Sequence, residues 1–166
     1  HSVEFGADNL LLDLGGGSLE LARGGPQRAD KVVSLPLGSV TMHLSHLKKE
    51  PPQARAIKAL QEAVRRAIEP YRDSFGVRSH TQVFGSSGTF EAVGVAIAQR
   101  QGQTHVHEGN LGGFSFEVTA LSALLAELQK LTVAQRIRAG IDPRRADIIV
   151  AGVAILDAAL RALGAE

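Results

Sequence analysis

The sequence predicts an α/β domain: a mixed five-stranded sheet with helices on both faces. Three apolar runs joined by tight Gly-rich or Gly-Pro turns open the chain, which predicts strands connected by hairpins. Strand and helix patterns then alternate, as in parallel pairing through helical crossovers. The length of 166 residues fits one compact unit, so residues 1–166 are expected to form a single domain.

Five strands are expected, at 10–14, 18–23, 31–37, 81–84 and 104–107. The first is an apolar run interrupted by Asp13, and the second alternates with a period of two residues. Pro36, near the end of the third, indicates a strand terminus or sheet edge, because proline lacks the N–H that a ladder needs.

Six helices are expected, at 39–48, 53–72, 90–99, 122–131, 133–139 and 144–163. The longest places its apolar residues three and four apart, which forms one buried stripe. Ser39 is a suitable N-cap for the first helix, and Asp142-Pro143 is a good N-cap and N1 pair for the last.

The composition excludes several classes of protein. With no cysteine, the chain has no disulfides, thiolate zinc site or thiol nucleophile, and a cytoplasmic location is expected. The net charge of +1 and only six Phe and one Tyr argue against binding to DNA or RNA. No apolar run reaches the roughly 18–20 residues of a membrane span. The chain starts at His1 and ends in a helical pattern, so a piece of a longer protein is expected.

The first chemical candidate is the loop in "LLLDLGGGSLEL". Gly15, Gly16 and Gly17 let backbone amides approach an anion, and Ser18 adds a hydroxyl donor. Asp13 ends the preceding strand, where it can hold a hydrated Mg²⁺ or a water, and Glu20 shares a face with Ser18. A plain hairpin is the alternative, but three glycines between Asp and Ser favour phosphate.

The second candidate is "GSSGT", between a strand and a helix, where free amides and hydroxyls can bind anions. An ordinary capped strand–helix turn is the alternative. Two such turns at strand ends of one sheet support each other. The expected phosphate-binding residues are Gly15, Gly16, Gly17, Ser18, Gly85, Ser86, Ser87, Gly88 and Thr89.

Basic residues are a weaker signal. The helix at 53–72 has a basic face preceded by Lys48 and Lys49, which could touch a polyanion. Glu62 and Glu69 interleave on that face, so a solvated, salt-bridged surface is the preferred interpretation.

Four motifs, in order and over nearly the whole chain, resemble the exopolyphosphatase / guanosine pentaphosphate phosphohydrolase (Ppx/GppA) family. The segment "LLLDLGGGSLEL" resembles its "DIGGGSTEL" phosphate loop, and "VSLPLGSVTM" its "SLPLG" strand with the helix start that follows. The segment "FGSSGTFEAVG" is similar to its "GxSGT" loop, and "LTVAQRIRAGIDPRRADIIVAGVAIL" to its "RAD" segment.

This resemblance implies a ribonuclease-H-like lobe of the actin-like, sugar-kinase-like ATPase fold. The chain would be the second, C-terminal lobe, with the first lobe and a C-terminal strand missing. It also implies release of the terminal phosphate of polyphosphate or guanosine pentaphosphate with Mg²⁺. A homodimer is a further expectation, from the lobe-facing surface left exposed.

The resemblance also assigns roles to residues. Asp13 and Glu20 would be catalytic: Asp13 orients water or Mg²⁺, the latter through water, and Glu20 lines the site. The general base is expected in the missing lobe, so the chain alone is expected to be inactive. Arg145 and Asp147 match "RAD" and would be structural or cleft-lining. Leu19 replaces the usual Thr of "GGGST", which removes a hydroxyl.

Two other functions stay open. The chain could be a regulatory module that binds phosphate or a nucleotide without turnover. It could instead be a lobe of a kinase-like phosphotransferase, although the "SLPLG" and "RAD" segments favour the hydrolase.

Overall fold

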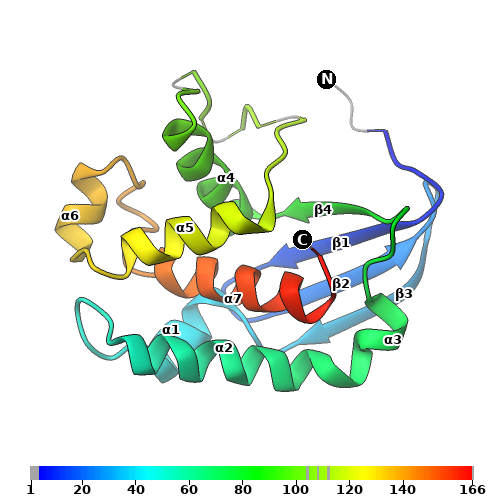
Figure 1. Ribbon diagram of the computed structural model, residues 1–166, viewed down its shortest axis with the longest axis horizontal. Helices are drawn as coiled ribbons and strands as arrows, with labels where there is room; N and C mark the ends of the chain where they lie inside the picture. The colour runs from blue at the N-terminus through cyan, green and yellow to red at the C-terminus, as the bar shows by residue number, and fades with distance from the viewer. Residues whose placement is uncertain (1–3, 104, 108, 112, 166) are drawn as a thin grey trace.

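The computed structural model describes residues 4–103, 105–107, 109–111 and 113–165. Four strands form one mixed sheet in the order β3-β2-β1-β4, with β1 antiparallel to β2 and parallel to β4 (Figure 1). The strands are β1 (Asn9–Leu14), β2 (Leu19–Gly24), β3 (Ala29–Leu35) and β4 (Gln82–Ser86). The helices are α1 (Ser39–His46), α2 (Ala54–Ile68), a 3₁₀ turn (Glu69–Tyr71), α3 (Arg72–Phe75), α4 (Gly88–Arg100), α5 (Val118–Leu128), α6 (Val133–Arg138) and α7 (Ile149–Ala162).

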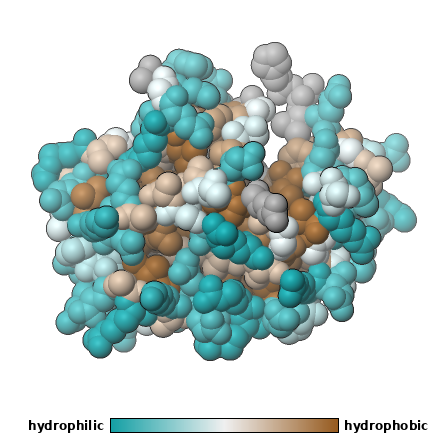
Figure 2. All heavy atoms as spheres, viewed as in Figure 1, coloured by the Kyte–Doolittle hydropathy of each residue, from teal (hydrophilic) through white to brown (hydrophobic). Residues whose placement is uncertain are grey.

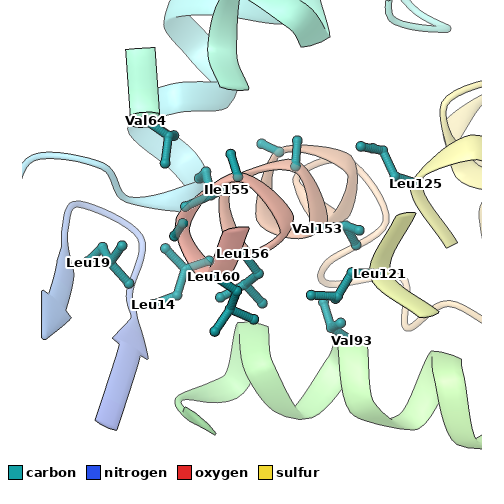
Figure 3. Packing of buried hydrophobic residues seen from close by; sticks show 14 of the residues in the cluster. Leu14, Leu19, Val64, Val93, Leu121, Leu125, Val153, Ile155, Leu156 and Leu160 are labelled. Carbon is teal, nitrogen blue, oxygen red and sulfur yellow. The ribbon is translucent and has the colours of Figure 1, made fainter. Parts of the chain in front are cut away.

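The core forms around α7, in which every residue from Ile149 to Leu160 is buried. This helix packs against α2, α5, α1 and α4. Figure 3 shows Leu14, at the end of β1, beside Leu156 and Leu160 of α7. A helix that is apolar all round needs cover on every side, and burial between the sheet and the other helices provides it.

The helices gather on one face of the sheet, which corrects the expectation of helices on both faces (Figure 1). On the other face Leu11, Ala22 and Val32 align across β1, β2 and β3, and Val32 is 67% exposed. The apolar run of residues 10–14 is typical of a buried strand. In β1 only alternate residues are fully buried, so one face of the sheet is not covered by helices.

The fifth strand expected at 104–107 is absent from the described part of that segment, residues 105–107, and Thr104 lies outside the described residues. The N–H of Val106 donates to the Gln103 carbonyl at 3.4 Å, and that of Asn110 to the His107 carbonyl at 3.0 Å. These are turn hydrogen bonds within the segment, so its backbone is used locally rather than in a sheet ladder.

The last helix begins at Ile149 rather than near Arg144. Asp142 does act as a cap, because its Oδ1 accepts from the Arg144 N–H at 2.8 Å, but the turn that it caps stays separate from α7. The other expected elements are confirmed with shifts of a few residues at their ends.

An ion pair fixes the sheet end remote from the glycine loop. Arg23 Nε and Nη2 donate to the two carboxylate oxygens of Asp8 at 2.9 and 2.7 Å, and Thr81 Oγ1 adds a bond of 2.6 Å. These hydrogen bonds, that of Arg23 first, lower the pKa of Asp8 below its ordinary value of 3.8. The stabilisation is therefore complete above that value and disappears as the pH falls through the lower folded-state pKa.

We expect Asp8→Asn to destabilise the chain by about 1–2 kcal/mol at pH 7, because charge-assisted hydrogen bonds are lost. The difference from the wild type should shrink as the pH falls below 3.8, where Asp8 itself becomes protonated. Urea denaturation at pH 7, 5 and 3 measures both effects. The control is Asp73→Asn, which alters an exposed carboxylate. A cost of Asp8→Asn that is the same at all three pH values would contradict the prediction.

Candidate functional site

The β1–β2 loop is held by α1 through its carbonyl groups. The N–H of Gly15 donates to the Ser18 carbonyl at 2.9 Å, which closes the loop. The carbonyl of Gly15 accepts from the Ser39 N–H at 2.9 Å, and that of Gly16 from the Val40 N–H at 3.0 Å. The loop therefore caps α1, whose first amides would otherwise lack partners.

The opposite side of the loop presents amides. A peptide group is planar and trans, so a carbonyl that faces α1 directs the next N–H away from it. The N–H groups of Gly16, Gly17 and Ser18 donate to no atom of the described residues. A Cβ on Gly17 would meet nothing within 4 Å, so the folded chain itself does not need glycine there. Three successive amides without an acceptor make this side of the loop a candidate anion-binding surface.

Two carboxylates lie beside this loop on the open face of the sheet. Asp13 of β1 pairs directly with Glu20 of β2, which places their Cβ atoms about 5 Å apart. The register continues the row with Ser34 of β3 on one side and Ser86 of β4 on the other. The sheet thus carries an acid pair flanked by two hydroxyls.

Glu20 is held as a carboxylate. Hydrogen bonds from Ser18 and then Ser34 lower the pKa of Glu20, and Ser34 Oγ donates to Glu20 Oε1 at 2.7 Å. Among the described residues no group of three or more His, Cys, Asp and Glu side chains could hold a metal alone. One or two carboxylates completed by phosphate oxygens and waters are the usual ligands of Mg²⁺, so the chemistry of Asp13 and Glu20 fits this ion.

The second loop is tied to the first by Ser87. This residue has φ 95° and ψ 157°, a region that residues with side chains rarely occupy. Its Oγ donates to the Leu14 carbonyl at 2.7 Å and accepts from the Phe90 N–H at 3.4 Å. The hydroxyl of Ser87 therefore joins the two loops and caps α4.

Some of the other residues of the second loop make structural contacts, and others leave backbone amides without an acceptor at the candidate site. Thr89 is buried, and its Oγ1 lies 3.4 Å from Ser39 Oγ, so this hydroxyl links α4 to α1. Gly85 lies in the β4 ladder, and the Phe90 ring occupies the place of its missing Cβ. The N–H groups of Gly88 and Thr89 have no acceptor among the described residues, and they begin α4.

The "RAD" segment reaches this loop. The Arg145 guanidinium occupies the position that a Cβ of Gly88 would take, which brings a positive charge to the start of α4. Asp147 is exposed, and its charge helps to keep Arg136 protonated although burial lowers the pKa of Arg136. Arg145 thus lies at the candidate site, whereas Asp147 Oδ1 accepts from the Ile148 N–H at 2.8 Å and acts on Arg136 only through its charge.

The sequence did not reveal how two residues, Gly38 and Ser39, contact the glycine loop. A Cβ on Gly38 would collide with the backbone of Gly16 and Gly17, so this glycine permits the close contact between α1 and the loop. Ser39 was identified as an N-cap, yet the cap is Gly38 and the Ser39 hydroxyl donates to the Gly15 carbonyl at 3.2 Å. The Gly-Ser dipeptide before the expected helix was the sequence feature that could have indicated these contacts.

Substitutions at Ser87 should separate backbone strain from hydrogen bonding. Ser87→Ala loses the bond to Leu14 and keeps the unfavourable φ, so we expect a loss of about 1–3 kcal/mol in the free energy of unfolding. Ser87→Gly loses the same bond but relieves the strain, and should be about 1 kcal/mol more stable than Ser87→Ala. Chemical denaturation measures both variants. Equal stability of the two would show that the backbone at Ser87 is not strained.

Comparison with known proteins places this arrangement in a family. The model of the Ppx/GppA phosphatase family matches residues 1–166. Exopolyphosphatase 1 of Mycobacterium leprae is 29% identical over 166 residues, which cover 95% of this chain and 46% of that protein. Exopolyphosphatase 1 of Mycobacterium tuberculosis is 29% identical over 159 residues, 95% of this chain and 45% of its own length.

Solved structures agree at the level of the fold. A PPX-GPPA enzyme of Aquifex aeolicus superposes with a TM-score of 0.83 at 20% identity, covering 97% of this chain and 52% of that one. An exopolyphosphatase of Cytophaga hutchinsonii gives a TM-score of 0.75 at 20% identity, with 95% and 50% covered. The chain spans about half the length of the relatives that it matches.

The family match therefore covers the whole of this chain, including both glycine loops and the acid pair that flanks the first of them. With the shared fold, it establishes that the chain belongs to the Ppx/GppA phosphatase family.

Proposed function

We propose that the full-length protein containing this chain hydrolyses phosphoanhydrides, releasing the terminal phosphate of inorganic polyphosphate or of guanosine pentaphosphate. One observation carries the proposal: the Asp13–Glu20 pair lies beside three loop amides that have no acceptor among the described residues. Phosphate needs donors, and an acid pair at its side suits the Mg²⁺ that usually accompanies it. The name exopolyphosphatase, carried by the mycobacterial relatives, supports this choice of substrate.

The residues would divide the work as follows. The amides of Gly16, Gly17 and Ser18 bind the terminal phosphate and stabilise the negative charge that develops on it. Asp13 holds Mg²⁺ through water, while Glu20 lines the site and orders the hydroxyls around it. Mg²⁺, when bound, supplies charge neutralisation on the phosphate oxygens.

The second loop would face the same phosphates from the other side. The amides of Gly88 and Thr89, at the start of α4, add donors, and the Arg145 guanidinium beside them adds positive charge. We assign Ser87 to the positioning of both loops, because its hydroxyl is engaged by Leu14 and Phe90.

We further propose that the chain is the second lobe of a two-lobed, actin-like enzyme. Its length, about half that of its relatives, supports this division. The residue that activates the attacking water would then come from the other lobe, since the role that the motifs imply for Asp13 is to orient water or metal.

The test is phosphate release by the full-length protein and by the isolated chain, each on long-chain polyphosphate and on guanosine pentaphosphate with Mg²⁺. We expect release by the full-length protein and none by the isolated chain. Robust release by the isolated chain would overturn the need for a base from outside it. Binding of both substrates by the full-length protein without release would indicate a binding module instead.

A further inference from the structure

A basic pocket lies at the corner between α1 and α2, outside the site described above. It has a volume of about 400 Å³, and its polar lining consists of His46, Lys48, Lys49, Gln53 and Arg55. The remaining lining is small and apolar, Ala56 and Ala59, and no Phe, Tyr, Trp or acidic side chain takes part. Figure 2 shows hydrophilic residues over the lower edge of the molecule, where Figure 1 places α2.

The fold keeps negative charge out of this pocket. Glu50 is the single acidic residue between Lys31 and Gln61. Its carboxylate lies 3.0 Å from the guanidinium of Arg136, a side chain that is 1% exposed. Arg136 is fixed in turn by bonds from its Nε and Nη1 to the carbonyls of Leu128 and Ala146. Glu50 is thus committed to a buried partner, and neither Lys48 nor Lys49 forms an ion pair with a described residue.

The start of α2 adds to the positive potential. Gln53 is its N-cap, but its side chain accepts from Arg55 Nε at 3.0 Å and caps no backbone amide. The first turn contains no acidic residue, although Asp or Glu is favoured there. The N–H groups of Ala54 and Arg55 have no acceptor among the described residues. This 15-residue helix therefore directs its positive end and free amides at the same corner as the four basic side chains.

The pocket is connected to the phosphate loop by α1. The helix begins at Ser39, which is bonded to Gly15, and ends at His46, which lines the pocket. Its 8 residues span about 12 Å. One flexible chain of linked phosphates can reach both places.

We propose that this pocket binds the non-reacting phosphates of a linear inorganic polyphosphate whose terminal phosphate occupies the glycine loop. This inference rests on the proposed function and deepens it, since it assigns the long-chain substrate class to the site. A polyphosphate chain presents repeated charge and no base or apolar group, which matches a lining of cations and small residues. The lining offers none of the Phe, Tyr or Trp rings on which the bases of single-stranded RNA usually stack.

The experiment compares Lys48→Ala/Lys49→Ala with Arg72→Ala/Arg78→Ala in the full-length protein. Both pairs remove two exposed positive charges, and the control pair lies beyond the other end of α2. Equilibrium binding of long-chain polyphosphate is measured without Mg²⁺, with single-stranded RNA as a competitor. Phosphate release is measured separately on long-chain polyphosphate and on tripolyphosphate.

We expect Lys48→Ala/Lys49→Ala to weaken long-chain binding about tenfold and to raise KM for the long chain similarly, with a shallower dependence on salt. The kcat, and KM for tripolyphosphate, should be unchanged, because a short substrate does not reach the pocket. The control variant should match the wild type in every assay.

Three results would overturn the proposal: equal long-chain binding by both variants, equal losses on long and short substrates, or competition by RNA as strong as that of polyphosphate at equal phosphate concentration. Failure of the proposed function looks different. The wild type would then release no phosphate from either substrate, while long-chain binding would still depend on Lys48 and Lys49.

Discussion

Asp13→Ala is expected to lower phosphate release by the full-length protein at least about a hundredfold, the usual loss when one electrostatic contact to a transition state is removed. Asp13 is the carboxylate nearest the glycine loop in β1, and its partner across the ladder is Glu20. If Asp13 anchors Mg²⁺ and its water as proposed, the variant keeps only the carboxylate of Glu20, on the neighbouring strand, beside the phosphate. The measurement is kcat under saturating polyphosphate and Mg²⁺.

Two further variants make this result specific. Asp13→Asn keeps the size of the side chain and should also lose activity, which separates charge from volume. Asp30→Asn removes an exposed carboxylate from the edge strand β3, and should leave kcat unchanged. Unchanged turnover in Asp13→Ala would remove this residue from the mechanism. Recovery of the Asp13→Asn variant at raised Mg²⁺ would support a role in holding the ion.

Gly38→Ala is expected to cost about 2–3 kcal/mol in the free energy of unfolding and to abolish most activity, because overpacking forces the backbone to shift. The added methyl would lie inside the contact distance of the Gly16 carbonyl and the Gly17 backbone. Either α1 or the loop must move, and the bonds from Ser39 and Val40 to the loop are then strained. Denaturation of the isolated chain and phosphate release by the full-length protein measure the two effects.

Gly17→Ala is the matched control, for which we expect a loss of activity without a loss of stability. A Cβ there meets nothing, so stability should be unchanged or higher by about 0.4–1 kcal/mol, because alanine restricts the unfolded chain. Activity should still fall, since the methyl narrows the approach to the loop amides. Full activity in Gly17→Ala would mean that no phosphate approaches Gly17. Wild-type stability in Gly38→Ala would mean that the contact between α1 and the loop can relax.

The strands and helices that have a clear hydrophobic period were predicted correctly from the sequence. The alternation in β2 and the stripe of α2 were readable because burial on one side fixes the period. The strand expected at 104–107 was read from only four residues, which carry little periodicity, and the described residues 105–107 form turn hydrogen bonds instead. The open face of the sheet could not be read from β1, since a mostly apolar strand looks the same whether one or two of its faces are covered.

The sequence indicated the two loops of the candidate site, but the contacts of each side chain in them could not be read from it. Asp13 and Glu20 follow from strand alternation once the hairpin register is known. Ser87 and Thr89 were expected to bind phosphate, but their hydroxyls contact Leu14 and Ser39. Sequence cannot distinguish a hydroxyl that faces a ligand from one that faces a neighbouring backbone, because that choice depends on how two loops from distant segments meet.

The capping of α1 by the glycine loop has an electrical consequence. The carbonyl of Gly15 and the N–H of Gly16 belong to one peptide group, as do the carbonyl of Gly16 and the N–H of Gly17. Each carbonyl accepts a bond from the first turn of α1, which pulls electron density along the conjugated amide and makes the far N–H a stronger donor. The dipole of α1 would therefore act on an anion at the loop through these two peptide groups, in addition to its direct field.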